Sequence, residues 1–150
     1  MKAFRFRLET LLSLRELAKD RAVRDYADAI ANRVQSEKNL ESAVSALTQL
    51  NAEITLKRKV GFLGFEQKNF NQLILQAKEL IINQNAKLAE SKSIEDGKRK
   101  LFLAADSNCK SLIKLKEKNK IEHLKREEKR EESELEDIIG ARFVFNQAPY

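Results

Sequence analysis

The chain has 150 residues, of which 35% are charged and 42% are apolar, whereas ordinary globular domains are about 25% charged and about 45–50% apolar. This composition leaves little apolar surface for a compact core, and the net charge is +6. Four glycines and one proline are too few turn residues for a multi-stranded sheet, so an all-α fold is expected. No apolar run reaches the roughly 18 residues that a membrane-spanning helix needs, so the protein is not expected to be an integral membrane protein.

The first half of the chain shows a heptad pattern. Its apolar positions return with alternating spacings of three and four residues, which is typical of a coiled coil. The predicted seam consists of Val23, Tyr26, Ile30, Arg33, Glu37, Leu40, Val44, Leu47, Asn51 and Ile54. The pattern predicts a first helix over about residues 5–58.

A turn and a second helix follow. Gly61 and Gly64 give the backbone the freedom that a reversal needs, so a turn is predicted over about residues 59–65. The second seam consists of Phe70, Leu73, Ala77, Leu80, Gln84, Lys87, Ser91, Ile94, Lys98, Leu101, Ala105, Asn108, Leu112 and Leu115. The second helix is predicted over about residues 66–143. Gly97 costs about 1 kcal/mol in a helix interior, so a bend or local fraying is expected there.

Two heptad helices joined by a short turn most simply form an antiparallel coiled-coil hairpin, and residues 1–150 are expected to be one such domain. The turn position pairs Leu12 with Ile113, and the N-terminus then ends near Leu124. The longer second helix overhangs beyond that point, with a flexible tail predicted over residues 144–150. The overhang carries apolar side chains that the hairpin cannot cover: Leu135, Ile138, Ile139 and Phe143.

The chain opens with FRFRLETLLSLR, which joins aromatic and arginine residues to a run of leucines. Glu9, Arg15 and Glu16 interrupt the apolar runs and no small-residue cleavage site follows, so the segment is not expected to be a signal peptide. Two interpretations stay open. Either the leucines pack on the second helix, or the segment lies on a membrane surface with Lys2, Arg5 and Arg7 near anionic headgroups.

The start of the second helix has more apolar residues than one seam can bury. The surplus side chains are Ile74, Leu75, Ile81 and Ile82. Surplus apolar surface marks a partner site or a self-association face. The candidate stripe consists of Phe70, Ile74, Ala77 and Ile81, and the alternative is that a third helix or a dimer covers it.

A basic cluster in the second helix suggests nucleic-acid binding, because counterion release favours basic stripes. Its members are Lys110, Lys114, Lys116, Lys118, Lys120, Lys125, Arg126, Lys129 and Arg130. Interspersed glutamates, and the lack of an aromatic platform or a known recognition motif, favour a solvated helix face instead. No nucleic-acid partner is therefore expected.

The sequence contains no catalytic or metal-ligating motif. Cys109 and His123 are the only cysteine and histidine, too few for a structural zinc site or an internal disulfide. Carboxylates along a rod also lack a concave pocket in which their pKa values could be tuned. We expect a non-enzymatic protein with no cofactor, metal site or small-molecule substrate.

The two ends of the chain resemble a known family. The opening F-x-F-x-L-E-x-L-L-x-L-R-E is similar to the start of flagellar export proteins of the FliJ family, and ELEDIIGARF at residues 134–143 is similar to the charged tail of that family. The length and the two-helix plan fit as well. The resemblance therefore spans the whole chain.

The resemblance implies a cytoplasmic, non-enzymatic coiled coil of the flagellar type III protein export apparatus, with a role in flagellum biogenesis, motility and chemotaxis. Such proteins resemble the central stalk of rotary ATP synthases, and their paired helix ends engage the hexameric export ATPase. Other surfaces contact the export gate membrane protein and the cargo chaperones, peripheral to the inner membrane at the flagellar base. The alternatives are an injectisome-type stalk protein of the same class and a basic coiled-coil adaptor that binds nucleic acid.

The resemblance also implies candidate site residues. Those for ATPase binding at the helix ends are Phe4, Phe6, Leu8, Leu11, Leu12, Arg15, Leu135, Ile138, Ile139, Arg142 and Phe143. The stripe of Phe70, Ile74, Ala77 and Ile81 becomes the candidate docking surface for the export gate or for a chaperone.

Overall fold

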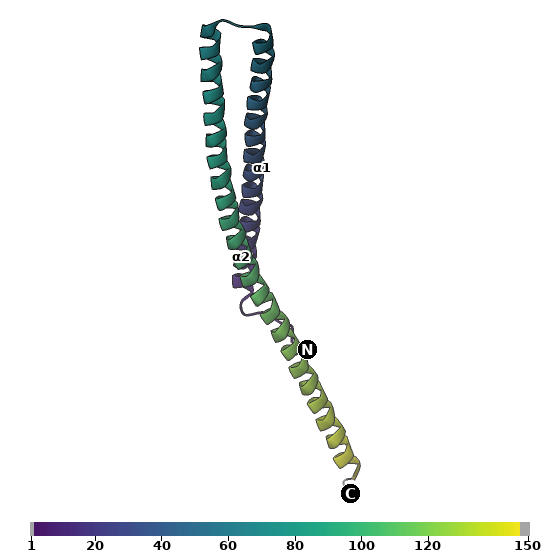
Figure 1. Cartoon of the computed structure of the whole chain (residues 1–150). Helices are drawn as coiled ribbons and strands as arrows, with labels where there is room; N and C mark the ends of the chain where they lie inside the picture. Colours follow the sequence, from purple (N-terminus) through teal and green to yellow (C-terminus); the bar gives the residue numbers. More distant parts are fainter. Residues whose placement is uncertain (1, 148–150) are drawn as a thin grey trace. The chain divides into compact units, whose positions relative to one another are not determined.

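The computed structural model describes residues 2–147. They form two helices, α1 (Glu9–Val60) and α2 (Gly64–Gln147), joined by residues 61–63. The helices pack against each other as an antiparallel hairpin, which confirms the predicted all-α fold (Figure 1). Helix α1 begins four residues after the predicted start, and α2 includes residues 144–147 of the predicted tail; residues 148–150 lie outside the described part of the chain.

The chain divides into two units. The hairpin unit is Asp20–Ala104, which contains the turn. The end unit combines residues 2–19 with residues 105–147.

The turn in the hairpin unit follows from charge and from glycine. Lys57, Arg58 and Lys59 occupy the last turn of α1, where positive charge interacts favourably with the helix dipole. Gly61 has a φ of 93° and its amide donates to the Lys57 carbonyl at 2.8 Å. Because this backbone conformation strains residues with a Cβ, Gly61 ends α1 and starts the reversal.

The heptad pattern of α1 is present, but alternate seam positions are one residue away from the predicted ones. The repeating covered positions are Ala22, Tyr26, Ala29, Arg33, Ser36, Leu40, Ala43, Leu47, Leu50 and Ile54. Ala43 is only 5% exposed, for example, whereas neighbouring Val44 is 45% exposed. The sequence pattern selected the larger residue of four such pairs, in which the helix interface covers Ala22, Ala29, Ser36 and Ala43. Leu50, which is covered in place of Asn51, is the exception.

Alternate seam positions of α2 are also one residue away from the predicted ones, but in the opposite direction along the chain. The covered positions in the hairpin unit are Phe70, Ile74, Ala77, Ile81, Gln84, Leu88, Ser91, Glu95, Lys98 and Phe102. Leu73, Leu80 and Leu101 of the predicted seam are exposed instead. Small side chains at alternate seam positions permit close approach of the helices, as the 2.9 Å hydrogen bond between the Ser36 and Ser91 hydroxyls shows.

A charged group also occupies the seam. Arg33 forms ion pairs with Glu95 on α2 and with Glu37 on its own helix. The hydrogen bond to Glu37 and the attraction of Glu95 raise the pKa of the Arg33 guanidinium above its ordinary value, against the opposing effect of desolvation. The contacts Arg33–Glu95 and Ser36–Ser91 join specific positions of the two helices, so they fix the register of the hairpin. This register lies within about one helical turn of the predicted pairing.

Helix α2 continues through Gly97, without the fraying that the sequence suggested. The adjacent Asp96 forms ion pairs with Arg99 at 2.9 Å and with Lys100 at 3.3 Å. The hydrogen bonds from Arg99 and Lys100 lower the pKa of the Asp96 carboxyl. Pairs three and four residues apart stabilise a helix locally, which offsets part of the cost of glycine.

The end unit has an apolar cluster of its own. Its buried members are Phe6, Leu12, Cys109 and Leu112, with Phe4 and Leu8 packed against them. Leu12 thus lies against α2 within one residue of the predicted Ile113. Ion pairs from Lys19 to Asp106 and from Glu9 to Lys116 join α1 and α2 on either side of the cluster, at 3.2 and 2.9 Å.

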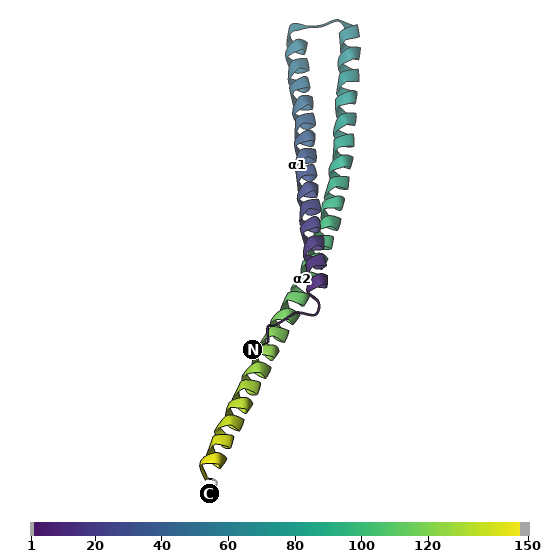
Figure 2. The same cartoon turned by 180° about the vertical axis from the view of Figure 1, so that it is seen from behind.

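Residues 2–8 precede α1 and run along α2 within the end unit (Figure 2). The Phe4 ring lies 5.7 Å from the His123 ring, and His123 Nε2 is 2.9 Å from the Lys2 carbonyl oxygen. Coverage of α2 extends to Glu127, just beyond the predicted end near Leu124. Every residue from 128 to 147 is exposed, as expected for an overhang.

Candidate functional site

The overhang of α2 presents an apolar face. Leu135, Ile138, Ile139 and Phe143 are between 53% and 60% exposed. Their spacings of three and four residues place them on one side of a helix. No other described segment of the end unit covers them, so the predicted C-terminal site residues are available to a partner.

One further apolar residue, Phe145, extends this face, whereas Val144 lies on the opposite side of the helix from Leu135. Val144 and Phe145 are 68% and 82% exposed, and the sequence analysis assigned them to a flexible tail. Helix α2 includes both of them. Phe145 lies seven residues after Ile138, so the heptad spacing could have identified it. Arg142 is exposed in the same turns of the helix.

The N-terminal site residues, unlike the C-terminal ones, are mostly covered by contacts with α2. Phe6 and Leu12 are buried in the apolar cluster of the end unit, and Phe4 and Leu8 are partly buried against it. The Arg15 guanidinium donates to the Asn108 carbonyl on α2 at 2.9 Å. These side chains hold residues 2–19 on α2, which corresponds to the interpretation that the segment packs on the second helix.

Leu11 is the most exposed apolar residue among the N-terminal candidates, at 38%. It lies on α1, away from the cluster that contains Leu12. The structure therefore brings the N-terminal candidates together around α2, and it leaves the C-terminal candidates on an uncovered stretch of the same unit.

The candidate stripe near the turn coincides with the observed seam. Phe70, Ile74, Ala77 and Ile81 are all partly covered. Phe70 is held by an edge-to-face contact with Phe62 at 5.4 Å and by the Lys57 ammonium 4.9 Å from its ring centre. The apolar side chains beside the stripe are the exposed ones: Leu73, Leu75, Leu80 and Ile82.

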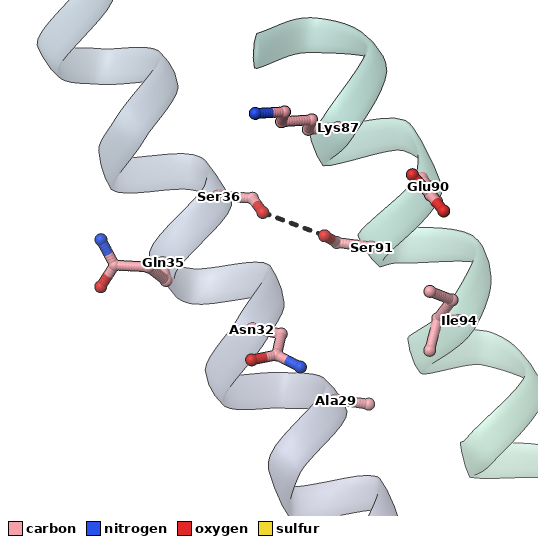
Figure 3. A pocket seen from close by; sticks show the side chains of 8 residues that line it. All are labelled: Ala29, Asn32, Gln35, Ser36, Lys87, Glu90, Ser91 and Ile94. Atoms are coloured by element: carbon pink, nitrogen blue, oxygen red, sulfur yellow. Dashed lines mark hydrogen bonds between the residues drawn. The ribbon is translucent and has the colours of Figure 1, made fainter.

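A hollow of about 450 Å³ lies between the helices of the hairpin unit (Figure 3). Ser36 and Ser91 point toward each other across it and share a hydrogen bond. The lining side chains include no histidine or cysteine, so neither serine has an adjacent imidazole to activate it as a nucleophile.

No group of three histidine, cysteine, aspartate or glutamate side chains within residues 2–147 is placed to hold a metal ion. Neither of the two described helices has a stretch long and apolar enough to cross a membrane.

Part of the basic cluster in α2 is neutralised by acidic neighbours. Lys110 lies 2.8 Å from Asp106, and Lys116 lies 2.9 Å from Glu9. Hydrogen bonds from Lys110 and Lys19 lower the pKa of the Asp106 carboxyl, so the carboxylate that neutralises them stays charged at neutral pH. This pairing favours a solvated face over a nucleic-acid site.

A family model described as flagellar FliJ protein matches residues 4–147. The chain belongs to the FliJ family. The membership identifies a coiled-coil protein related to flagellar export, from a family of non-catalytic export components. None of the curated proteins and none of the solved structures matched the chain.

Proposed function

We propose that this FliJ-family protein is a central-stalk-like component of the flagellar type III export apparatus, with its C-terminal overhang as the part that engages the export ATPase ring. The family match supports a flagellar role over an injectisome role. The observation that carries the proposal is the exposed apolar face of Leu135, Ile138, Ile139, Phe143 and Phe145. An amphipathic helix of this kind binds by placing its apolar face in a groove of a partner.

In this proposal the two chain ends have different tasks. The overhang supplies the contact area, since desolvated Phe, Leu and Ile side chains carry most of the affinity at such an interface. Phe4, Phe6, Leu8 and Leu12 act through their packing on α2, which holds the helix ends together. Arg142 and Leu11 are exposed at the two ends and complete the proposed ATPase-binding surface.

A second surface is proposed near the turn, for the export gate protein or for a cargo chaperone. Its apolar area comes from the exposed edge residues Leu73, Leu75, Leu80 and Ile82 together with the partly covered stripe from Phe70 to Ile81. We infer a cytoplasmic location at the flagellar base, peripheral to the inner membrane, from these proposed partners.

The test is binding of the purified export ATPase from the same organism. The variant Ile138→Glu/Ile139→Glu places two charges on the overhang face, and Leu75→Glu/Ile82→Glu places two on the edge near the turn. All four side chains are exposed, so both variants keep the fold, which circular dichroism checks. The proposal expects loss of ATPase binding only in the overhang variant. Unchanged binding by that variant contradicts it.

A further inference from the structure

The end unit contains a hollow of about 420 Å³ where residues 2–7 lie along α2. Basic side chains dominate its lining: Lys2, Arg5 and Arg7 from the N-terminal segment, and Arg126 from α2. Phe4 and His123 supply two aromatic rings, and no carboxylate contributes to the lining. Four cations therefore surround one space without an acidic side chain among them.

The backbone that carries these cations is held in place. His123 Nε2 donates to the Lys2 carbonyl at 2.9 Å, and the Phe4 and His123 rings are in contact at 5.7 Å. Phe6, between Arg5 and Arg7, is buried in the apolar cluster. The positions from which the basic side chains project are thus fixed, although the side chains themselves are exposed.

Among the described residues, acidic side chains do not neutralise these four cations, in contrast to Lys110 and Lys116 of the same unit. Within residues 2–147, Lys2, Arg5 and Arg7 form no ion pair, and the Arg126 guanidinium reaches only the Glu122 backbone carbonyl at 3.4 Å. Asp106 and Glu9 pair with lysines elsewhere in the unit. Unneutralised charge around a concave surface concentrates counter-ions there.

We propose that this hollow binds a phosphate group, either of a small soluble phosphate ester or of an anionic lipid headgroup. Guanidinium groups present paired N–H donors whose geometry matches phosphate oxygens. A phosphate monoester has three free acceptor oxygens and up to two charges, so it can engage more of the four cations around the hollow than a single carboxylate can. This inference does not depend on ATPase binding by the overhang, because the hollow shares none of the overhang's residues.

The test uses the full-length chain and titrates it with inorganic pyrophosphate by isothermal calorimetry at low ionic strength. The variant is Arg5→Gln/Arg7→Gln, and the control is Arg58→Gln/Lys59→Gln, which removes the same charge from the exposed end of α1 in the hairpin unit. A charge pair at about 4 Å in water corresponds to about a fivefold change in affinity. We expect about a fivefold loss for each arginine removed and no comparable loss in the control.

A second arm measures cosedimentation with phosphatidylcholine vesicles with and without phosphatidic acid, whose headgroup is a phosphate monoester. Binding that requires phosphatidic acid and the two arginines assigns the phosphate to a lipid, and pyrophosphate binding without vesicle binding assigns it to a soluble ester. The proposal is overturned if pyrophosphate does not bind, if both variants lose affinity equally, or if oligoglutamate competes with pyrophosphate at equal concentration. The last result identifies a carboxylate-bearing protein partner.

Discussion

The position of the coiled-coil seam gives the sharpest test of the fold. Ala43 is 5% exposed and Val44 is 45% exposed, although the sequence pattern placed Val44 in the seam. The hydrogen bond between Ser36 and Ser91 sets the register, and one heptad further along, this register places Ala43 opposite Gln84. A leucine at position 43 therefore has to displace α2, whereas a leucine at position 44 extends into solvent.

The expected stability changes of the two leucine variants follow from how closely each position is packed. Extra methylene groups in a closely packed interface cost about 1–3 kcal/mol, and exposed substitutions change stability by less than about 0.5 kcal/mol. For a chain of this size 1 kcal/mol corresponds to about 2–4 °C in Tm. We expect Ala43→Leu to lower the Tm by about 2–12 °C and Val44→Leu to leave it nearly unchanged. Alanine and leucine are both good helix formers, so propensity does not account for such a loss.

The assay is thermal unfolding followed by circular dichroism at 222 nm, where α-helices give a strong negative band. Urea unfolding is a second measure of stability. Equal losses for the two variants, or a larger loss for Val44→Leu, contradict the observed seam and restore the one that the sequence pattern gave.

The remaining predictions concern stability. Gly97→Ala should stabilise the chain by about 1 kcal/mol, because the added Cβ meets open space in a helix interior. Gly61→Ala should destabilise it by about 1–2 kcal/mol because Gly61 has a positive φ. Changes of the same sign in the free energy of unfolding, measured with urea, contradict this pair of predictions. Leu112→Ala should cost about 2–5 kcal/mol in the same measurement, since its side chain is buried, and a change within error contradicts the cluster. Asp106→Asn should destabilise the chain at pH 7. The folded state lowers the pKa of Asp106 through Lys110 and Lys19, so this contribution is present above the unfolded pKa of about 3.9 and is lost as pH falls below it; a difference in unfolding midpoint that persists in acid contradicts the assignment.

The heptad spacing and the two glycines near residue 61 were enough to predict the hairpin, its turn and its approximate register. They did not determine which of two adjacent residues enters the seam, because the pairs Ala43 with Val44 and Leu73 with Ile74 both keep a spacing of three or four. The choice depends on how closely the helices approach, and small residues such as Ser36 set that distance through a partner on the other helix.

The candidate site was predictable to a different extent at each end. Leu135 and Ile138 are exposed because no other described residue of the end unit covers them, and counting residues from the turn was sufficient to predict this. Residue counting was not sufficient to predict the burial of Phe6, because this burial depends on residues 2–8 running along α2 as a non-helical segment. The pattern instead suggested a helix from about residue 5.

The central claim is that the overhang of α2 acts on the export ATPase, and the ATPase turnover rate tests it most directly. The rate and the assembly of the hexameric ring are measured alone, with the full chain, and with Ile138→Glu/Ile139→Glu. The account predicts stimulation by the full chain and none by the variant. Equal stimulation by both, or no effect of the full chain, contradicts it.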